Sequence, residues 1–312
     1  MLRRPAGLKF FMPMVSVIMP NFNHARFLVD SIQSVLGQTL SDLELIIVDD
    51  CSSDHSSEII GRFSAVDARI KVMRHERNQG LSRSRNHALE LAAGELIAFC
   101  DADDIWESDK LELQVRLLES HPNYGLVYAD SLIIDEQGAP TGRRFSEIYG
   151  LPKTPSGSLF GDLVHGNFIN ILSVLMRKEC VRQVGPFDER VRWVQDWWYW
   201  LQLSRRHLFL YLPRPLAKYR VHGRSTNVSQ KRAYCLDRIK VFRWILRDYS
   251  DLAPSAKANI LYSMGVDLCS LGKFGAGRRL LWGAMRCSFA DVKSFGRLCK
   301  TAVRLASTFA SK

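Results

Sequence analysis

The chain has 312 residues and a mass of 35.6 kDa, and 46% of its residues are hydrophobic and 24% charged. This size and composition excludes a disulfide-stapled miniprotein, a collagen-like chain and a mostly disordered one. Residues 205–312 hold 22 Lys/Arg against 5 Asp, a net charge of +17, whereas residues 1–204 have a net charge of −6. The basic third predicts a polyanionic partner such as a membrane surface or a nucleic acid, and the acidic part is suited to divalent cations.

The N-terminal residues and the cysteines bear on where the protein acts. Residues 1–13 place three basic side chains ahead of an apolar stretch, which faintly resembles a signal peptide. Pro13 and Pro20 interrupt that stretch and no small-residue cleavage site follows, so we interpret residues 1–13 as a short extension. The seven cysteines form no C-x-x-C pair, and their odd number favours a reduced, cytoplasmic chain.

Short apolar runs rich in β-branched residues predict strands at Val15–Met19, Leu43–Val48, Ile70–Met73, Glu95–Cys100 and Leu126–Tyr128. Their starts lie roughly 25 to 30 residues apart, which is the length of one strand and one returning helix. The segments between them carry apolar residues at helical spacing. Because the strands are apolar throughout, we expect both faces of the sheet to be buried, which indicates a parallel α/β fold.

Acidic and amide side chains follow three of the predicted strands, at residues 20–23, 49–54 and 101–104. In open parallel sheets, ligands bind beyond the carboxyl ends of the strands. Clustered carboxylates also need a cation or hydrogen-bond donors to offset their repulsion. Asp101 and Asp103 in isolation would suggest a turn, but their position directly after a buried strand, with Asp49 and Asp50 at the equivalent strand end, predicts a binding site.

With these residues in view, the chain closely resembles the inverting family 2 glycosyltransferases, which have the GT-A nucleotide-sugar-binding fold. The resemblance runs from Val15 to about Asn227 and rests on the order and spacing of its motifs. The motifs are V-S-V-I-M-P-N-F-N at 15–23, I-V-D-D-C-S-S-D at 47–54, N-Q-G-L-S-R-S-R-N at 78–86, Gly94 through D-A-D-D at 101–104, V-G-P-F-D-E at 184–189, Q-D-W-W-Y-W at 195–200 and Y-R-V-H-G-R-S-T-N at 219–227. It implies a GT-A catalytic domain over residues 14–229 with a mostly parallel central sheet, followed by a basic α-helical region over residues 230–312.

The resemblance implies nucleotide-binding roles for residues after the first two strands. Asp50, with Asp49 beside it, is expected to accept hydrogen bonds from the base or the ribose. Pro20, Asn21 and Asn23 are expected to shape the loop over the base, although Asn23 is equally suited to cap a helix. Asp54 is expected to cap the helix that begins near Ser53.

The resemblance also assigns roles around the D-A-D-D motif. Arg85 and Asp101 are expected to contact the nucleotide, the latter at the ribose, while Asp104 is expected to cap a following turn. Asp103 and the late His222 are expected to bind Mn²⁺ or Mg²⁺, although a lone histidine is more often structural. A divalent cation would relieve the repulsion between carboxylates and a nucleoside diphosphate and would stabilise the departing diphosphate.

Inverting transfer needs one carboxylate that takes the proton from the attacking hydroxyl. The resemblance places this base at Asp196, although Gln195 stands where the family has Glu. The alternative is a helix N-cap beneath core aromatics. Trp197 and Trp198, in the aromatic run that follows, are candidates for stacking against the acceptor sugar, with core packing as the alternative.

The basic region after about Gln230 has helical periodicity. Apolar residues on both sides of Gly272 predict one helix-turn-helix that resembles the tetratricopeptide type. Its basic face is either solvated or attached to anionic lipid, and Phe295, Leu298 and Phe309 favour attachment. We expect no nucleic-acid partner, because no recognition module is visible.

Together these observations predict an enzyme that moves a sugar from a nucleoside-diphosphate sugar, with UDP as the expected nucleotide, to a hydroxyl of a glycan or lipid-linked acceptor in cell-surface polysaccharide synthesis. We expect it in the cytoplasm, at the inner face of the plasma membrane. The alternatives are a metal-dependent phosphohydrolase and a non-catalytic sugar-nucleotide-binding protein. A dehydrogenase is disfavoured because no G-x-G-x-x-G follows the first strand.

Overall fold

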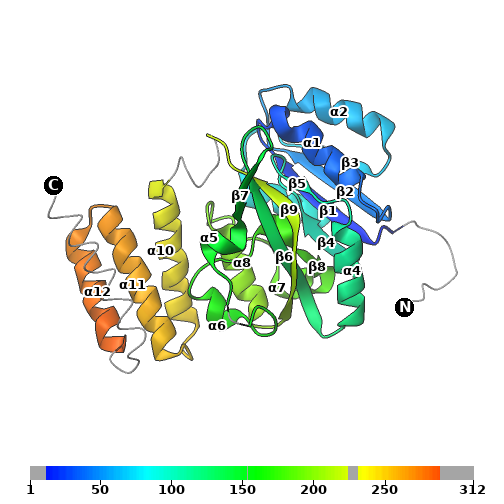
Figure 1. Ribbon diagram of the computed structural model, residues 1–312. Helices are drawn as coiled ribbons and strands as arrows, with labels where there is room; N and C mark the ends of the chain where they lie inside the picture. Colours follow the sequence, from blue (N-terminus) through cyan, green and yellow to red (C-terminus); the bar gives the residue numbers. More distant parts are fainter. Residues whose placement is uncertain (1–11, 153, 224–230, 289–312) are drawn as a thin grey trace. The chain divides into compact units, whose positions relative to one another are not determined.

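The computed structural model describes residues 12–152, 154–223 and 231–288 of the chain (Figure 1). It divides the chain into two compact units, residues 1–223 and residues 224–312. The division falls six residues before the boundary predicted at 229. Most of the predicted N-terminal extension lies outside the described residues, as do the last four residues of the 219–227 motif and the tail residues Phe295, Leu298 and Phe309.

The first unit is built on a nine-stranded sheet with the order β3-β2-β1-β4-β8-β6-β9-β5, in which β7 pairs with β6. Four strands pair in parallel at one end of this sheet: β1 (Val15–Asn21), β2 (Leu43–Asp49), β3 (Ile70–Arg74) and β4 (Leu96–Phe99). They coincide with the first four predicted strands to within two residues at each end. The predicted α/β fold with a mostly parallel sheet is confirmed.

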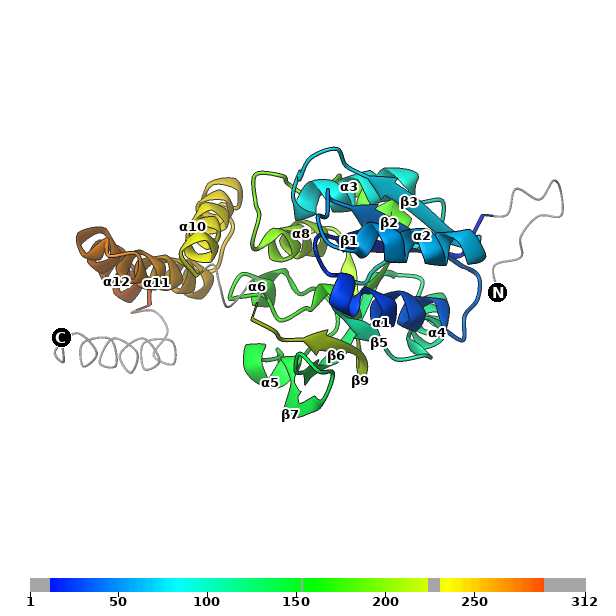
Figure 2. The same ribbon diagram turned by 90° about the horizontal axis from the view of Figure 1, so that it is seen from above.

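The order of these strands creates a topological switch point, at which open parallel sheets have a crevice that binds ligands. The chain steps from β1 to β2 to β3 and then returns past β1 to β4. Because such crossovers are right-handed, α1 (Ala25–Leu36) and α2 (Ser56–Val66) cover one face of the sheet and α3 (Leu81–Leu91) covers the other (Figure 2). The chain thus adds strands first on one side of β1 and then, with β4, on the other. In open parallel sheets ligands bind at such a switch point, beyond the carboxyl ends of the two strands.

The other end of the sheet contains β6, which includes the fifth predicted strand, Leu126–Tyr128, but is longer, and further strands that the sequence did not predict. β8 (Leu175–Arg177) lies antiparallel between β4 and β6 (Tyr124–Ile134), and β9 (Leu208–Arg220) runs parallel to β6. Two short strands, β5 (Ile105–Trp106) and β7 (Pro140–Arg144), pair antiparallel with β9 and β6. The remaining helices of this unit are α4 (Lys110–Ser120), α5 (Phe145–Tyr149), α6 (Phe160–Leu163), the 3-10 helix η1 (Ile171–Ser173), α7 (Lys178–Val184) and α8 (Gln195–Ser204).

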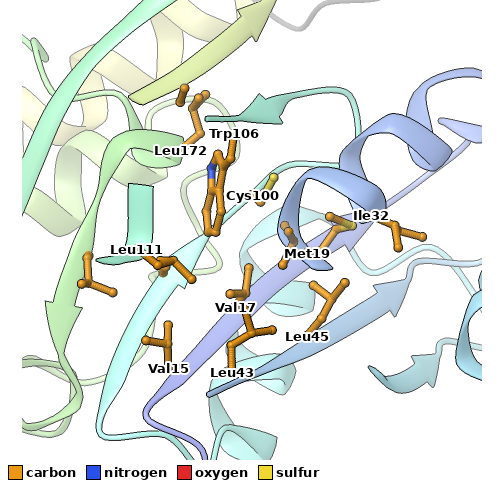
Figure 3. Packing of buried hydrophobic residues seen from close by; sticks show 14 of the residues in the cluster. Val15, Val17, Met19, Ile32, Leu43, Leu45, Cys100, Trp106, Leu111 and Leu172 are labelled. Atoms are coloured by element: carbon orange, nitrogen blue, oxygen red, sulfur yellow. The ribbon is translucent and has the colours of Figure 1, made fainter. Parts of the chain in front are cut away.

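The core is centred on β1, whose alternate side chains Val15, Val17 and Met19 pack beside Leu45 of β2 and Ile32 of α1 (Figure 3). Every residue of β1 and β2 is buried, so both faces of these strands are covered as predicted. The same prediction was wrong for β3. There Val72 is 46% exposed, because β3 is the edge strand and its outer residues lack a covering layer.

One buried residue of the core carries an ionisable amine. Lys110, in the first turn of α4, is fully buried, and its Nζ donates to Gln114 Oε1 at 2.8 Å and lies 4.0 Å from the centre of the Trp106 ring. Burial lowers the pKa of Lys110 to about 7. The unfolded chain therefore binds one more proton than the folded chain between about pH 7 and the ordinary lysine pKa of about 10.4.

This burial predicts a measurable pH dependence of stability. The free energy of unfolding of the wild type, relative to that of Lys110→Met, is expected to rise by about 1.4 kcal/mol per pH unit between about pH 7.5 and 9.5. Urea denaturation across this range measures the difference. Lys71→Met is the matched control, since the Lys71 side chain is 49% exposed, and its difference from wild type should stay constant. A constant difference for Lys110→Met would contradict the prediction.

The second unit contains three described helices, α10 (Lys231–Asp248), α11 (Pro254–Ser270) and α12 (Phe274–Ser288). The predicted helix-turn-helix is confirmed as α11 and α12, and the turn uses Gly272 in the left-handed region at φ 76°. The two helices approach closely at Gly265 and Gly277, where a Cβ on Gly277 would lie 2.8 Å from the carbonyl oxygen of Gly265. Among the described residues, no helix has the length and hydropathy that a membrane span requires.

Candidate active site

Two loops at the carboxyl ends of β1 and β2 are joined by polar contacts. Pro20 and Asn21 end β1, and the Asn21 amide donates to Asp49 Oδ1 at 2.9 Å. Asn23 adopts φ 59°, and its Oδ1 accepts from the backbone N of Ser53 at 2.8 Å. Asn23 therefore caps the neighbouring loop and is not the N-cap of α1, which was its alternative role.

Asp54 joins the same two loops from the other side. Its carboxylate accepts from the backbone N of Ala25, the first residue of α1, at 2.9 Å and from that of Ser56, the first residue of α2, at 3.0 Å. Burial would raise the pKa of Asp54, but these hydrogen bonds outweigh it and the pKa lies below its ordinary value. The prediction that Asp54 is the N-cap is not confirmed, because α2 begins at Ser56 and its N-cap position is His55. Asp54 instead binds the first backbone N of α2 from the residue before the N-cap.

Asp49 and Asp50, the predicted nucleotide ligands, both have protein partners. Asp49 is buried and accepts from Asn21 and Ser57, and it forms an ion pair with Arg74 at 3.5 Å. Asp50 Oδ1 accepts from the backbone N of Gln79 at 2.8 Å and Oδ2 accepts from that of Gly80 at 2.8 Å. Both carboxylates therefore also organise the loops around them.

Behind Asp50 lies a short chain of histidines. His75 Nδ1 lies 2.7 Å from Asp50 Oδ1, and His75 Nε2 lies 2.8 Å from Nδ1 of His87 on α3. These contacts connect the residue that follows β2 to α3 through His75. Beside them, a cavity of about 460 Å³ opens at the start of α3 between residues 77–83, Glu189 and Arg192.

Arg85 joins the D-A-D-D motif to the rest of the site. Its Nη2 donates to both oxygens of Asp101, at 2.8 and 3.0 Å. Arg85 is buried, yet its Nε and Nη1 have no hydrogen-bond partner among the described residues. Its guanidinium also lies 5.7 Å from the centre of the Phe187 ring. Buried donors without partners are uncommon, so Arg85 is a candidate for contact with an anionic ligand.

Asp103 and His222 form a pair at the crevice. His222 Nε2 lies 3.0 Å from Asp103 Oδ2. Burial would raise the pKa of Asp103, but the hydrogen bond with His222 and the nearby His24 outweigh it and hold the pKa below its ordinary value. One nitrogen of each histidine and one oxygen of Asp103 all lie within 4.8 Å of one another. Nitrogen and carboxylate donors at this spacing fit a divalent transition-metal ion.

Asp104 corrects one prediction. It does not cap a following turn, because its Oδ1 accepts from the backbone N of Arg220 at the end of β9, at 2.8 Å. Burial and the neighbouring carboxylates of Asp103 and Asp101 raise its pKa well above the ordinary value. Arg220 in turn donates through Nε to the carbonyl oxygen of Asp103 at 2.8 Å. These two contacts fix the D-A-D-D loop against the end of β9, two residues before His222.

Asp196, the predicted base, lies in the first turn of α8. Its Oδ2 accepts from Asn167 Nδ2 at 2.9 Å. Burial raises the pKa of Asp196, and the positive charge of Arg85 opposes this rise. The N-cap position of α8 is Val194, so Asp196 is not the N-cap that the alternative reading required.

The aromatic run after Asp196 is part of the interior. Trp197 is 3% exposed and its Nε1 donates to the carbonyl oxygen of Leu163 at 2.7 Å, while Trp198 is 7% exposed. The positions of these two residues do not support the prediction that they stack against an acceptor sugar. The sequence shows the type and spacing of these residues, but it does not show that other elements cover the sides of α8 on which they lie.

The structure adds three residues that sequence reasoning missed. His24 follows the first motif directly, and Arg220 lies inside the last one, so motif position was an available signal for both. Asn167 lies in a loop without a motif, and only the structure brings it to Asp196.

Known proteins resemble this chain in sequence. The profile of Glycosyl transferase family 2 matches residues 16–167. The Bacillus subtilis protein TuaG, named as a teichuronic acid biosynthesis glycosyltransferase, is 32% identical over 222 residues, which cover 71% of this chain and 84% of TuaG. The Escherichia coli protein WfgD, named as a UDP-Glc:alpha-D-GlcNAc-diphosphoundecaprenol beta-1,3-glucosyltransferase, is 33% identical over 62% of this chain and 70% of its own length. Some relatives are much longer than this chain. It is 30% identical to a Rickettsia bellii glycosyltransferase but spans only 32% of the length of that protein.

Solved structures agree in fold. The structure of Staphylococcus aureus TarS residues 1–349 with UDP-GlcNAc aligns with a TM-score of 0.64 at 18% identity, over 88% of this chain and 81% of that one. The mannosyltransferase PcManGT of Pyrobaculum calidifontis, solved with GDP-Man and Mn²⁺, aligns with a TM-score of 0.62 at 18% identity, over 98% and 84% of the two chains. The fold is that of the GT-A glycosyltransferases. The chain belongs to glycosyltransferase family 2 and is a glycosyltransferase.

Proposed function

We propose that the protein transfers a sugar, with inversion, from a nucleoside-diphosphate sugar to a hydroxyl of a glycan or lipid-linked acceptor in cell-surface polysaccharide synthesis. The observation that carries the proposal is that Arg85 interacts with two acidic groups, as it is ion-paired with Asp101 and electrostatically coupled to Asp196. Asp103 of the Asp103–His222 pair belongs to the same D-A-D-D motif as Asp101. This arrangement supports the proposal, since it combines a buried cation, candidate metal ligands and a candidate base.

The donor binds at the carboxyl ends of β1, β2 and β4 in this proposal. Pro20, Asn21 and Asn23 form the loop on one side, and Asp49 and Asp50 lie at the adjacent strand end. A carboxylate offers about four acceptor positions, so Asp50 keeps capacity for a base or ribose donor beyond its three protein contacts.

The phosphates and ribose bind next to the D-A-D-D loop. Arg85, which is paired with Asp101, has two donors without a partner among the described residues, which suits a diphosphate, and Asp101 would offer its oxygens to ribose hydroxyls. UDP is the proposed nucleotide, since the names of WfgD and the TarS structure contain UDP-sugars, while PcManGT was solved with GDP-Man.

Asp103 and His222 would hold Mn²⁺ or Mg²⁺. When bound, the cation supplies positive charge that stabilises the diphosphate as it leaves. The hydrogen bond between the two side chains keeps their donor atoms together, and Arg220 holds the backbone of Asp103.

Asp196 would act as the base that accepts the proton of the acceptor hydroxyl. A single base suffices because the diphosphate leaves without being protonated, unlike the oxygen leaving group of a glycoside hydrolase. Asn167 orients the carboxylate through its amide. The raised pKa brings the base closer to the pH at which it must take up and release a proton.

The second unit would attach the enzyme to anionic lipid. One side of α12 alternates exposed aromatic and basic residues at intervals of four: Phe274, Arg278, Trp282 and Arg286, with Trp282 63% exposed. Aromatic side chains favour the membrane interface and basic ones bind acidic headgroups. This chain resembles WfgD, whose named acceptor is a diphosphoundecaprenol lipid. That resemblance supports an enzyme that works at a membrane surface.

Removing two charges from this side of α12 tests the attachment. Arg278→Gln with Arg286→Gln is expected to weaken binding to phosphatidylglycerol-containing vesicles roughly 30-fold, since each basic residue near such a surface contributes about 1 kcal/mol. Vesicle co-sedimentation measures the affinity. The control pair Arg232→Gln with Arg243→Gln removes the same charge from exposed positions of α10. An equal loss in both variants would show that net charge alone, and not this side of α12, determines binding.

The proposed activity is tested by incubating the protein with Mn²⁺ and a panel of UDP-, GDP- and dTDP-sugars. We expect binding and slow hydrolysis of one UDP-sugar, and faster turnover when a lipid-linked acceptor is added. Failure to bind any of the sugars would contradict the proposal. Turnover of simple phosphate esters would favour a phosphohydrolase, and binding without turnover under any condition would favour a non-catalytic protein.

A further inference from the structure

We propose that His24 is a third protein ligand of the metal, so that two imidazoles and one carboxylate bind the ion and select Mn²⁺ or a similar transition-metal ion over Mg²⁺. The inference rests on the proposed metal site at Asp103 and His222. It adds a residue from another loop and a metal preference that follows from the donor set.

The position of His24 is fixed by its own loop. Asn23, in the left-handed region, turns the chain between β1 and α1 and is held by Ser53 and Asp54. His24 then lies at the N-cap position of α1, where its side chain makes no capping hydrogen bond. Its ring meets that of His222 edge to face, with centroids 5.9 Å apart. The imidazole is therefore directed to the Asp103–His222 pair and does not serve its helix.

The spacing of the donor atoms fits one coordination sphere. Neighbouring ligands at right angles around an ion with bonds of about 2.1 Å lie roughly 3 Å apart. Asp103 Oδ2 and His222 Nε2 are 3.0 Å apart, and the donor atom of His24 lies within 4.8 Å of both. All three donor atoms therefore lie close enough together to approach one ion.

Three separate elements deliver these ligands, and each is braced. Asp103 lies in the loop between β4 and β5, where Arg220 binds its carbonyl oxygen. His222 follows β9, whose last residue is tied to Asp104. His222 also packs against Phe27 of α1, with ring centroids 4.9 Å apart. The braced loops reduce the conformational entropy that is lost when a cation binds.

The proposed preference for Mn²⁺ over Mg²⁺ follows from the chemical types of the three donor atoms. Mg²⁺ prefers oxygen ligands and retains its waters, whereas imidazole nitrogen suits transition-metal ions. With Asp103 as the only carboxylate of the group, two of the three protein donors are nitrogens. The rival explanation is that His24 only packs against His222 and offsets the negative charge of Asp103, which requires no metal and predicts no metal preference.

Metal binding to the full chain in the presence of UDP separates these explanations. Mn²⁺ and Mg²⁺ affinities are measured by titration calorimetry for the wild type, His24→Gln and the control His55→Gln, whose side chain is 82% exposed in the neighbouring loop. We expect His24→Gln to weaken Mn²⁺ binding about tenfold or more while changing Mg²⁺ binding little, so that the preference for Mn²⁺ collapses. The control should bind both ions as the wild type does.

A spectroscopic readout counts the nitrogens directly. Electron spin echo modulation of bound Mn²⁺ is expected to show two ¹⁴N couplings in the wild type and one in His24→Gln. Unchanged Mn²⁺ affinity in that variant, or one coupling in the wild type, would overturn the inference. If His24→Gln fails to fold, His24→Asn replaces it, and circular dichroism establishes which variant is used.

Failure of this inference and failure of the proposed function give different results. If Asp103→Asn loses Mn²⁺ binding while His24→Gln retains it, the proposed metal site stands and His24 is not a ligand. If Asp103→Asn retains Mn²⁺ binding, the proposed metal site itself is wrong, and the inference falls with it.

Discussion

Asp196→Asn is expected to lower the rate of sugar transfer by about 10²- to 10⁴-fold, the range that a positioned base contributes, while donor binding stays within a few-fold of wild type. Asparagine keeps an oxygen that can accept from Asn167 but takes up no proton at neutral pH. Transfer rate and donor affinity are measured separately. Asp162→Asn is the control, since it removes an exposed carboxylate from nearby α6.

Two results would contradict the role of Asp196. Transfer that survives the substitution would place the base elsewhere, and loss of donor binding together with transfer would make Asp196 a donor ligand. The stability of the variant provides a further check. Because burial raises the pKa of Asp196 in the folded chain, its ionised form costs stability above that pKa. Asp196→Asn is therefore expected to unfold at a higher temperature than wild type at pH 7.

The raised pKa also sets the pH profile of transfer. Asp196 must be ionised to accept a proton, so activity is expected to fall as the pH drops through its pKa, and this fall should occur at a higher pH than for an ordinary aspartate. Transfer rates measured over a series of buffers of decreasing pH check this expectation.

Asp103→Asn is expected to weaken Mn²⁺-dependent donor binding by roughly 3 kcal/mol, or about 100-fold. The substitution removes the anionic donor from the group formed with His222 and His24. Donor binding in EDTA should change little, because the metal-independent contacts remain. Donor titrations with and without Mn²⁺ measure both quantities.

Glu119→Gln provides the matched control for Asp103→Asn, since it removes an exposed carboxylate from α4. Equal losses with and without Mn²⁺ would show that Asp103 contacts the nucleotide directly. That result, combined with loss of metal dependence in Asp101→Asn, would mean that the roles of the two aspartates are exchanged.

The sequence was sufficient to predict the parallel half of the sheet. β4 is a continuous apolar run, and β1 and β2 are apolar apart from Ser16 and Glu44 until they reach their polar ends. Short strands carry no comparable signal. β5 has two residues and β8 has three, and both form by pairing with partners distant in the chain. Periodicity does not detect elements of this length.

The candidate site was predictable only where a motif marks it. The aspartates of 101–104 and Asp196 lie in motifs, but their partners are far away in sequence: Arg220 reaches Asp104 across 116 positions. Residue type also did not predict orientation. Trp197 and Trp198 were candidates for an exposed platform, yet the packing of α8 buries them.

The contacts that join the β1 and β2 loops bear on how donor preference changes during evolution. Asn23 holds the backbone of residues 53 and 54, and Asp54 holds the backbone at Ala25, so each loop supplies a support for the other. Substitutions in two such loops have non-additive effects, since each alters the setting of its neighbour. A new nucleotide preference is therefore expected to require paired changes in both loops, with single changes acting as deleterious intermediates.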